Sequence, residues 1–336
     1  MKILFICKDR SSEGYGHYGS FGLMNSAKMV CDVLNENNVE GKMVVVTDAN
    51  SIDKEVTNYN PTHIIIEAIW VTPAKMIELK NLYRHKDRQW IIRTHSRIPF
   101  LSMEGNSIDW IFDYSKIGKN VHVSFNCKET NKEFSNLIEK EAIYLPNLYT
   151  IHDYTKNYKS HHHYWIDIGC FGSIRPLKNT LIQAVAAIKY ADSLDLHLRF
   201  HINDRPEQLG DRVLKNLNLL FKNRPEHLLV KHKWMNHHDF ILLLRQMNIS
   251  MQVSMSETFN MVIADSVDNN IPVVVSKEIG YLPNYVKASE TSVDSIFSVL
   301  KLVNKTKFFG VIINKHYLIN FVKSALKHWI DLKFLN

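Results

Sequence analysis

The chain has 336 residues, of which 45% are hydrophobic, and its 41 Lys and Arg against 34 Asp and Glu give a formal net charge of +7. It is too long for one ordinary core and too apolar for a disordered chain, so we expect two domains of about 150 residues each. The longest apolar run, residues 64–71, is interrupted by Glu67, and the apolar N-terminal run is only residues 3–7. These lengths exclude a membrane span and a secretion signal.

The positive charge favours a polyanionic partner or an acidic substrate, with solubility as the alternative reason for it. The cysteines are far apart and form no C-x-x-C pair, which is typical of reduced core residues in a cytoplasmic protein. They are Cys7, Cys31, Cys127 and Cys170. The three consecutive histidines 161–163 are interpreted as part of a solvated linker rather than as a metal site.

Short β-branched runs alternate with helical or loop segments along the first half of the chain. Runs that are apolar on both faces are typical of parallel strands in an α/β sandwich. The strands predicted here are residues 2–7, 42–46, 62–67, 89–94, 121–125 and 142–145.

The same pattern restarts after a polar stretch, residues 154–163. Apolar residues at helical spacing predict helices over 178–193 and 238–247, and a long helix over 315–333 that must pack against something. The sequence therefore predicts two Rossmann-like domains joined near residue 155. The strands predicted in the second are residues 165–172, 196–202, 227–232, 249–254 and 271–276.

A glycine cluster follows the first strand, with Gly14, Gly16 and Gly19 at the spacing G-x-G-x-x-G and Gly22 after them. A dinucleotide fingerprint has its first glycine directly after the strand and an acidic residue about 20 positions further on. Both spacings are wrong here, since the acid that ends the second strand is Asp48. The cluster instead favours close approach of the backbone to an anion at a helix N-terminus, with a ligand-free loop as the alternative.

A second candidate site follows the first strand of the second domain, in the segment FGSIRPLKN at 171–179. Arg175 and Lys178 arrive there as the chain turns into a helix. Such a pair can clamp a diphosphate, because the guanidinium binds two oxygens and the ammonium acts as a point charge. A basic loop that faces solvent is the alternative.

A third candidate lies in residues 254–276, where a strand, a polar turn, a helix and a Pro-led strand follow one another. Glu257 and Asp265 are eight residues apart, about 12 Å along a helix, so both can face one ligand. Asp265 stands among apolar residues and needs a partner, which a pair of sugar hydroxyls would supply. The alternative makes Glu257 a helix-dipole residue and Asp265 a solvated one.

These motifs resemble those of the GT-B glycosyltransferases, and specifically the retaining family 4 type. Its motif is Glu, seven residues, Glu, then a small-residue helix, Gly and Pro-Val-Val. Glu257 matches the first acid, and Asp265, one methylene shorter, replaces the second. Asn260 and Asn270 stand at glycine positions, which the backbone survives because Asn tolerates the left-handed region. The specific motifs lie in residues 165–285.

The resemblance implies two Rossmann-like domains facing each other across a cleft. Residues 1–155 would bind the acceptor, 156–313 would bind the nucleotide-sugar donor, and the helix 314–336 would cross back to the first domain. The implied activity is hexosyl or pentosyl transfer from a nucleotide sugar, with a UDP-sugar favoured, to an acceptor hydroxyl with retention. The family suggests front-face attack with the diphosphate taking the proton. No cofactor is implied, and because the chain has no D-x-D motif we expect metal independence.

The resemblance also assigns roles to residues of the donor side. Glu257 would bind hydroxyls of the donor sugar and Asp265 those of the ribose, while Arg175 and Lys178 would stabilise the departing diphosphate. Ser173 stands where the family often has arginine, a charge that Arg175 supplies instead. The other donor-side residues are Gly16, Gly19, Gly172, Ser173, Ser256, Thr258, Phe259 and Asn260.

The first domain should hold the acceptor. His95 ends a predicted strand, at the edge where α/β proteins bind ligands, and Glu67, Arg93 and Arg97 lie nearby if the third and fourth strands are neighbours. His95 is expected to bind the donor sugar or orient the acceptor hydroxyl, with a structural histidine as the alternative. Asn147 resembles the family's interdomain Pro-Asn element.

The sequence gives less information about the acceptor than about the donor. The positive charge, the many histidines and the lack of a membrane-associating amphipathic face favour a polyanion, such as DNA with hydroxymethylated pyrimidines, as in phage base-modifying glycosyltransferases. A cell-envelope or other glycan is the competing acceptor. Two other classes stay open: a nicotinamide-dependent sugar-modifying enzyme and a non-catalytic nucleic-acid-binding protein.

Overall fold

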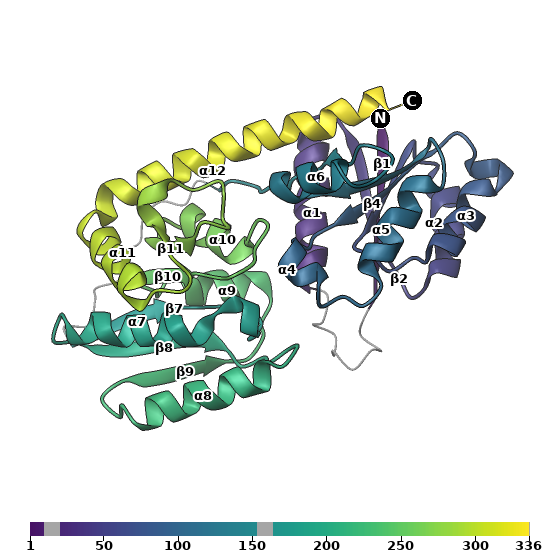
Figure 1. Cartoon of the computed structure of the whole chain (residues 1–336). Coiled ribbons are helices and arrows are strands. Elements are labelled where there is room, and N and C mark those ends of the chain that lie inside the picture. The colour runs from purple at the N-terminus through teal and green to yellow at the C-terminus, as the bar shows by residue number, and fades with distance from the viewer. Residues whose placement is uncertain (10–20, 153–163, 336) are drawn as a thin grey trace. The chain divides into compact units, whose positions relative to one another are not determined.

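The computed structural model describes residues 1–9, 21–152 and 164–335 (Figure 1). These residues form two compact units, one of Met1–Thr150 with Val322–Asn336 and one of Ile151–Phe321. Each unit holds one six-stranded sheet whose strands all pair in parallel. The α/β class predicted from the sequence is therefore confirmed.

The sheet of the first unit has the order β2-β1-β3-β4-β5-β6. Its strands are β1 Lys2–Lys8, β2 Glu40–Val46, β3 His63–Glu67, β4 Gln89–Thr94, β5 Val121–Phe125 and β6 Ile143–Tyr144. Every residue of β3 and β5 is buried, as expected for strands covered on both faces. The helices between them are α1 Phe21–Glu36, α2 Ile52–Tyr59, α3 Pro73–Asn81, α4 Ile98–Leu101, α5 Ser107–Lys116 and α6 Lys128–Ser135.

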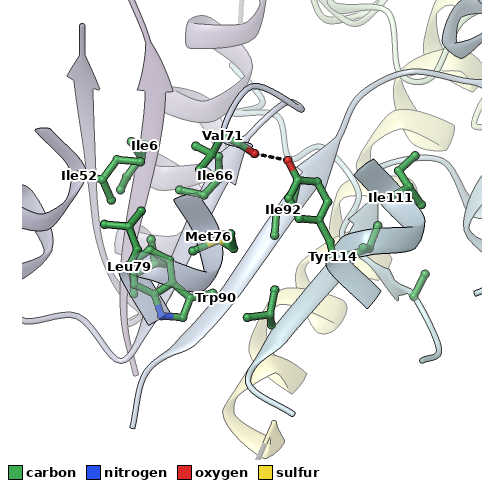
Figure 2. Close-up of a cluster of buried hydrophobic side chains, with 14 of the residues drawn as sticks. Ile6, Ile52, Ile66, Val71, Met76, Leu79, Trp90, Ile92, Ile111 and Tyr114 are labelled. Atoms are coloured by element: carbon green, nitrogen blue, oxygen red, sulfur yellow. Dashed lines mark hydrogen bonds between the residues drawn. The ribbon is translucent and has the colours of Figure 1, made fainter. Parts of the chain in front are cut away.

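One face of this sheet packs against α2, α3 and α5 (Figure 2). Ile66 and Ile92 of adjacent strands meet Met76 of α3, and the hydroxyl of Tyr114 donates to the carbonyl of Val71. Helix α3 begins at Pro73 because the Thr72 hydroxyl accepts from the backbone N–H of Lys75 at 3.2 Å and proline suits the first turn of a helix.

The sheet of the second unit has the order β12-β11-β10-β7-β8-β9. Its strands are β7 Trp165–Gly169, β8 His197–Asn203, β9 Leu228–His232, β10 Ile249–Gln252, β11 Val273–Ser276 and β12 Lys287–Ala288. Each strand predicted from the sequence is present, and the two-residue β12 is an addition. The helices are α7 Thr180–Asp192, α8 Gly210–Lys222, α9 His237–Leu244, α10 Met261–Asp268, α11 Val293–Lys305 and α12 Lys307–Ile330.

Helix α12 starts eight residues earlier than the predicted residue 315, and Gly310 lies inside it. A glycine normally weakens a helix interior. Here a Cβ would lie 3.1 Å from the Tyr285 hydroxyl, so the small residue lets the helix pack closely. Residues of α12 up to Phe321 belong to the second unit and those from Val322 to the first.

The end of α12 completes the core of the first unit. The buried Trp329 packs on Phe5, with ring centroids 5.6 Å apart, and its indole N–H donates to the carbonyl of Pro146 at 2.8 Å. The four cysteines are buried and free, as expected of core residues. Among the residues that the structure describes, no helix is both long and apolar enough to cross a bilayer.

Candidate functional site

Two loops meet at the carboxyl edge of the second sheet. One follows β7 and leads through a short 3-10 turn, Pro176–Lys178, into α7, and the other follows β10 and leads into α10. Because β7 and β10 are neighbours in the sheet, both loops leave it side by side. The backbone N–H of Met255 donates to the carbonyl of Leu177 at 2.9 Å, which joins the loops directly.

Lys178 and Glu257 form an ion pair between these loops. Their side chains are only 17% and 10% exposed. Breaking an ion pair that is largely removed from water would leave each charge with an uncompensated desolvation cost, so the pair holds the two loops together. The structure thus brings together one residue from each of the two motifs that the sequence singled out in this domain.

Two side-chain amides, the buried Gln183 and the half-buried Asn179, hold the two loops in place, and the sequence analysis did not identify them. The side chain of Gln183, on α7, accepts from the N–H of Val253 at 2.8 Å and donates to the carbonyl of Lys178 at 2.9 Å. Asn179 has a left-handed backbone, with φ of 59°, and its amide donates to the carbonyls of Val253 and Glu290. The sequence offers one signal for the role of Asn179, because an asparagine that directly follows a Pro-Leu-Lys turn is typical of a turn position with left-handed backbone.

Asn260 fixes the start of α10. Its φ is 62°, its side-chain oxygen accepts from the N–H of Ile263 at 3.0 Å, and its amide donates to the Gln252 side chain at 3.0 Å. The predicted tolerance of left-handed backbone at Asn260 and Asn270 is confirmed, since the φ of Asn270 is 59°. Because Asn260 caps the helix, Glu257 precedes α10, and the expectation that it shares a helix with Asp265 was wrong.

Asp265 is 2% exposed and has His237 of α9 as a hydrogen-bond partner, with the ring Nε2 at 3.0 Å from Oδ1. The hydrogen bond to Asp265 raises the pKa of His237 against the opposing effect of burial. Asp265 was expected to need a partner, and His237 of the same chain is that partner. Because Asp265 is buried, the alternative that it is a solvated residue is excluded. The sequence analysis missed His237, which stands 28 residues before Asp265.

Two buried hydroxyls of the second unit, those of Tyr281 and Ser254, have no hydrogen-bond partner among the described residues. Burial raises the pKa of Tyr281, and the negative charges of Asp265 and Glu257 raise it further. Tyr281 therefore lies within electrostatic reach of both acids. Unsatisfied buried polar groups are uncommon in native proteins and are a feature of sites that receive a polar ligand.

The other described donor-side residues lie in the same two loops, which follow β7 and β10. Gly172 has a φ of 108°, and its N–H donates to the Asn203 side chain at 2.8 Å. Arg175 is partly exposed and donates to the side chain of Gln208 at 3.4 Å. The side chain of Phe259 is buried against Tyr281 and Phe321. Partly exposed side chains complete the group at Ser173, Ser256 and Thr258.

A buried polar cluster occupies the carboxyl edge of the first sheet. Strands β3 and β4 are neighbours, as the sequence analysis required, and pair Glu67 with Arg93. The Arg93 guanidinium donates to Glu67 at 3.1 Å, to the Leu145 carbonyl at 3.1 Å and to Asn147 at 2.6 Å. Burial raises the pKa of Glu67, but the charge of Arg93 and the hydrogen bonds that Glu67 accepts from His95 and Arg93 outweigh it, and the net shift is downward.

This burial corrects the expectation that Glu67 and Arg93 contact an acceptor. Both side chains have no exposed surface, so neither can reach a ligand. Arg93 instead stacks 5.0 Å from the Trp329 ring centroid. The two residues support His95, whose carboxylate partner is Glu67.

His95 keeps a 17% exposed side chain with both ring nitrogens engaged. Nε2 contacts Glu67, and Nδ1 lies 3.2 Å from the Asn126 amide. Since the amide donates, Nδ1 accepts and Nε2 carries the proton. Burial and then Arg93 lower the pKa of His95, which keeps the ring neutral. His95 is therefore held in one tautomer, and neither of its ring nitrogens has a free lone pair with which to act as a base.

The remaining candidates of the sequence analysis are Arg97, the glycine cluster and the three histidines. Arg97 directly precedes α4 and is partly exposed. The glycines at positions 14, 16 and 19 and the three histidines lie outside the described residues, while Gly22 is at the start of α1, where a Cβ would meet nothing. The predicted contact of Gly16 and Gly19 with the donor diphosphate stays a prediction.

One group of described residues has the spacing of a metal site, with ligand atoms of Asp192, Glu226 and His227 within 4.8 Å of one another. Arg224 already pairs with Asp192 at 2.9 Å and also with Glu226. These carboxylates are therefore neutralised within the chain, and the group is separate from the Lys178 pair.

No family model matches the sequence, and no curated protein does. Solved structures do match the fold. Anabaena HepE, in complex with UDP and glucose, has a TM-score of 0.67 at 12% identity, with 99% of this chain and 100% of that chain covered. The chain has the GT-B fold. Sucrose-phosphate synthase from Thermosynechococcus elongatus gives a TM-score of 0.65 at 8% identity, covering 99% and 98%.

A mutant of S. aureus TarM in complex with fondaparinux, alpha-GlcNAc-glycerol and UDP also matches the GT-B fold, with a TM-score of 0.62 and 13% identity. The match covers 80% of this chain and 55% of that one, so the present chain spans about half the length of TarM. The GT-B architecture expected from the donor motifs is confirmed.

Proposed function

We propose that this protein is a glycosyltransferase that moves a sugar from a UDP-sugar to an acceptor hydroxyl. The observation that carries the proposal is the ion pair between Lys178 and Glu257, since a lysine suited to binding phosphate lies there beside an acid suited to binding sugar hydroxyls. The sugar and the diphosphate of a donor are directly bonded, so their binding groups must also be adjacent. The presence of UDP in the HepE and TarM structures supports this choice of nucleotide.

Donor binding would exchange partners within the pair. The diphosphate takes the place of Glu257 beside Lys178, with Arg175 as the second cation, and sugar hydroxyls take the place of Lys178 beside Glu257. Asp265 then receives the ribose hydroxyls, next to the buried hydroxyl of Tyr281. Negative charge develops on the leaving diphosphate as the glycosidic bond breaks, and a fixed ammonium and guanidinium stabilise that charge.

We propose transfer with retention by front-face attack. The two acids of this site are engaged, Glu257 with Lys178 and Asp265 with His237, which suits hydrogen bonding to the donor better than nucleophilic attack. The bond from the anomeric carbon to the diphosphate oxygen breaks, and the bond to the acceptor oxygen forms on the same face. The acceptor proton passes to the departing diphosphate. No metal is required in this proposal.

The net charge of +7 supports a polyanionic acceptor, and hydroxymethylated pyrimidine in DNA is the acceptor that we propose. A cell-envelope glycan is the second candidate, supported by the exposed apolar residues of α12.

The donor is tested with a panel of UDP-, GDP- and ADP-sugars, by slow hydrolysis of the nucleotide sugar and by thermal shift. We expect a response to a UDP-sugar and loss of hydrolysis in Glu257→Ala. No response to any nucleotide sugar, or full activity in Glu257→Ala, would contradict the proposal. Binding of reduced nicotinamide cofactor would instead favour the sugar-modifying class.

The acceptor is tested with a labelled donor sugar, offered in parallel hydroxymethylated DNA and a cell-envelope fraction. Mass spectrometry of the digested DNA identifies a glycosylated base directly. Label in the envelope fraction alone would replace the DNA acceptor by the glycan. DNA binding without any hydrolysis of donor would indicate a non-catalytic binding protein.

A further inference from the structure

The first half of α12 presents an apolar face to solvent. The side chains of Phe309, Phe308 and Ile312 are 76%, 61% and 59% exposed. Ile313 and Tyr317 of the same helix are exposed as well. These residues follow one another at helical spacing, so they share one side of α12. We call them the α12 apolar face.

The sequence analysis expected no membrane-associating amphipathic face, and it did not identify these exposed apolar residues as part of a helix. The sequence analysis started the helix at residue 315 and so left Phe308, Phe309 and Ile312 outside it. With the helix beginning at Lys307, the same residues form one face. Contiguous exposed apolar side chains are uncommon on a protein that has no partner for them.

The opposite side of α12 is fixed to the body of its unit. Val311 and Leu318 are buried, and the hydroxyl of Tyr285 donates to the carbonyl of Gly310 at 2.9 Å and to the side chain of Asn314 at 2.8 Å. Rotation of the helix to hide its apolar face would break these hydrogen bonds and expose the buried residues. The face is therefore a permanent feature of the folded unit.

Charge distinguishes this region from the rest of the surface. From Ser295 to Ile330 the sequence contains six lysines and neither Asp nor Glu. Three of the lysines, Lys301, Lys305 and Lys307, come directly before the α12 apolar face, and the ammonium of Lys307 lies 5.7 Å from the ring centroid of Phe308. Apolar side chains next to cations are the composition of helices that lie on anionic bilayers.

We propose that the α12 apolar face binds the surface of an anionic phospholipid bilayer. Phe308 and Phe309 would enter the boundary between headgroups and acyl chains, and the three lysines would contact headgroup phosphates. DNA would use the lysines but gain nothing from exposed phenylalanines. A second copy of the chain, paired face to face, would bring lysines against lysines. The bilayer is the one partner that satisfies both the charge and the apolar surface.

The test is co-sedimentation of the full chain with vesicles. Vesicles of phosphatidylcholine with phosphatidylglycerol should bind the protein, vesicles of phosphatidylcholine alone should bind it weakly, and added salt should release it. Phe308→Ser with Phe309→Ser should weaken binding by about tenfold or more, because both insertion residues are lost. Lys301→Gln with Lys305→Gln and Lys307→Gln should remove the preference for anionic lipid.

The matched control is Tyr83→Ser, which removes an 83% exposed aromatic side chain from the other unit and should leave binding unchanged. Thermal midpoints of all variants establish that they are folded. The proposal fails if the wild type does not sediment with anionic vesicles, or if the phenylalanine variant sediments equally well. It also fails if sedimentation velocity shows a dimer that the phenylalanine variant abolishes while vesicle binding is absent. None of these measurements uses a sugar donor, so their outcome is independent of the proposed enzymatic activity.

Discussion

Lys178 and Glu257 contact each other although 79 positions separate them in the chain. We predict that Lys178→Met lowers the rate of sugar transfer by about a hundredfold or more, because the charge on the departing diphosphate loses a fixed cation. The rate is measured with saturating donor, by release of UDP. Lys189→Met is the matched control, since Lys189 pairs with the 80% exposed Asp294 at the surface, and it should retain full activity.

Variants of the same pair distinguish its role in stability from its role in catalysis. Lys178→Met alone leaves Glu257 largely buried without its cation and should lower the thermal midpoint, whereas Lys178→Met with Glu257→Met removes both charges and should recover most of it. The double variant should remain inactive. Recovery of activity together with stability would mean that the pair has only a structural role.

His237 should make the free energy of unfolding depend on pH. Its pKa is raised in the folded protein by the hydrogen bond to Asp265. The protonated ring therefore stabilises the fold fully below its ordinary value of 6.5, and this contribution is lost as the pH rises through the raised folded value. Urea unfolding of the wild type and of His237→Gln should differ most at low pH and converge at high pH. An equal difference at both ends would contradict the assignment.

Arg93 should be essential to the stability of the first unit. Arg93→Met leaves Glu67 buried without a cation, a loss of about 3–5 kcal/mol in the free energy of unfolding. Chemical denaturation measures the loss. Arg84→Met is the control, because Arg84 pairs with Asp53 in a half-exposed position, and it should change stability little.

Chelation should not affect transfer. The proposed mechanism places the diphosphate on Lys178 and Arg175, so activity in excess EDTA should equal that of the untreated enzyme. If EDTA abolishes the activity and an added divalent cation restores it, this mechanism is wrong and a metal ion bridges the donor phosphates instead.

Much of the fold was predictable because its strands are buried on both faces. Runs such as residues 63–67 and 121–125 are marked by their own composition. The early part of α12 was not, because Gly310 and exposed phenylalanines contradict the usual helical pattern. That segment depends on a contact with Tyr285, 25 residues earlier, which no local pattern contains.

The site was predictable to the level of its charged residues. Glu257, Asp265 and Lys178 stand in recognisable motifs, whereas Gln183 and His237 act through partners distant in sequence. Glu67 and Arg93 were expected at an accessible edge because charged residues are rarely fully buried. Their mutual pairing, together with Asn147 and the Leu145 carbonyl, permits the exception.

The division of α12 between the two units has a consequence for biosynthesis. Trp329 is part of the core of the first unit, against Phe5 and the carbonyl of Pro146, yet it comes after the whole of the second unit in the chain. Domains usually fold in order as they leave the ribosome. Here the N-terminal unit cannot complete its core until the second unit has been synthesised, so the unit whose synthesis starts first is completed last, and its nascent chain must stay competent to fold while the second unit is made.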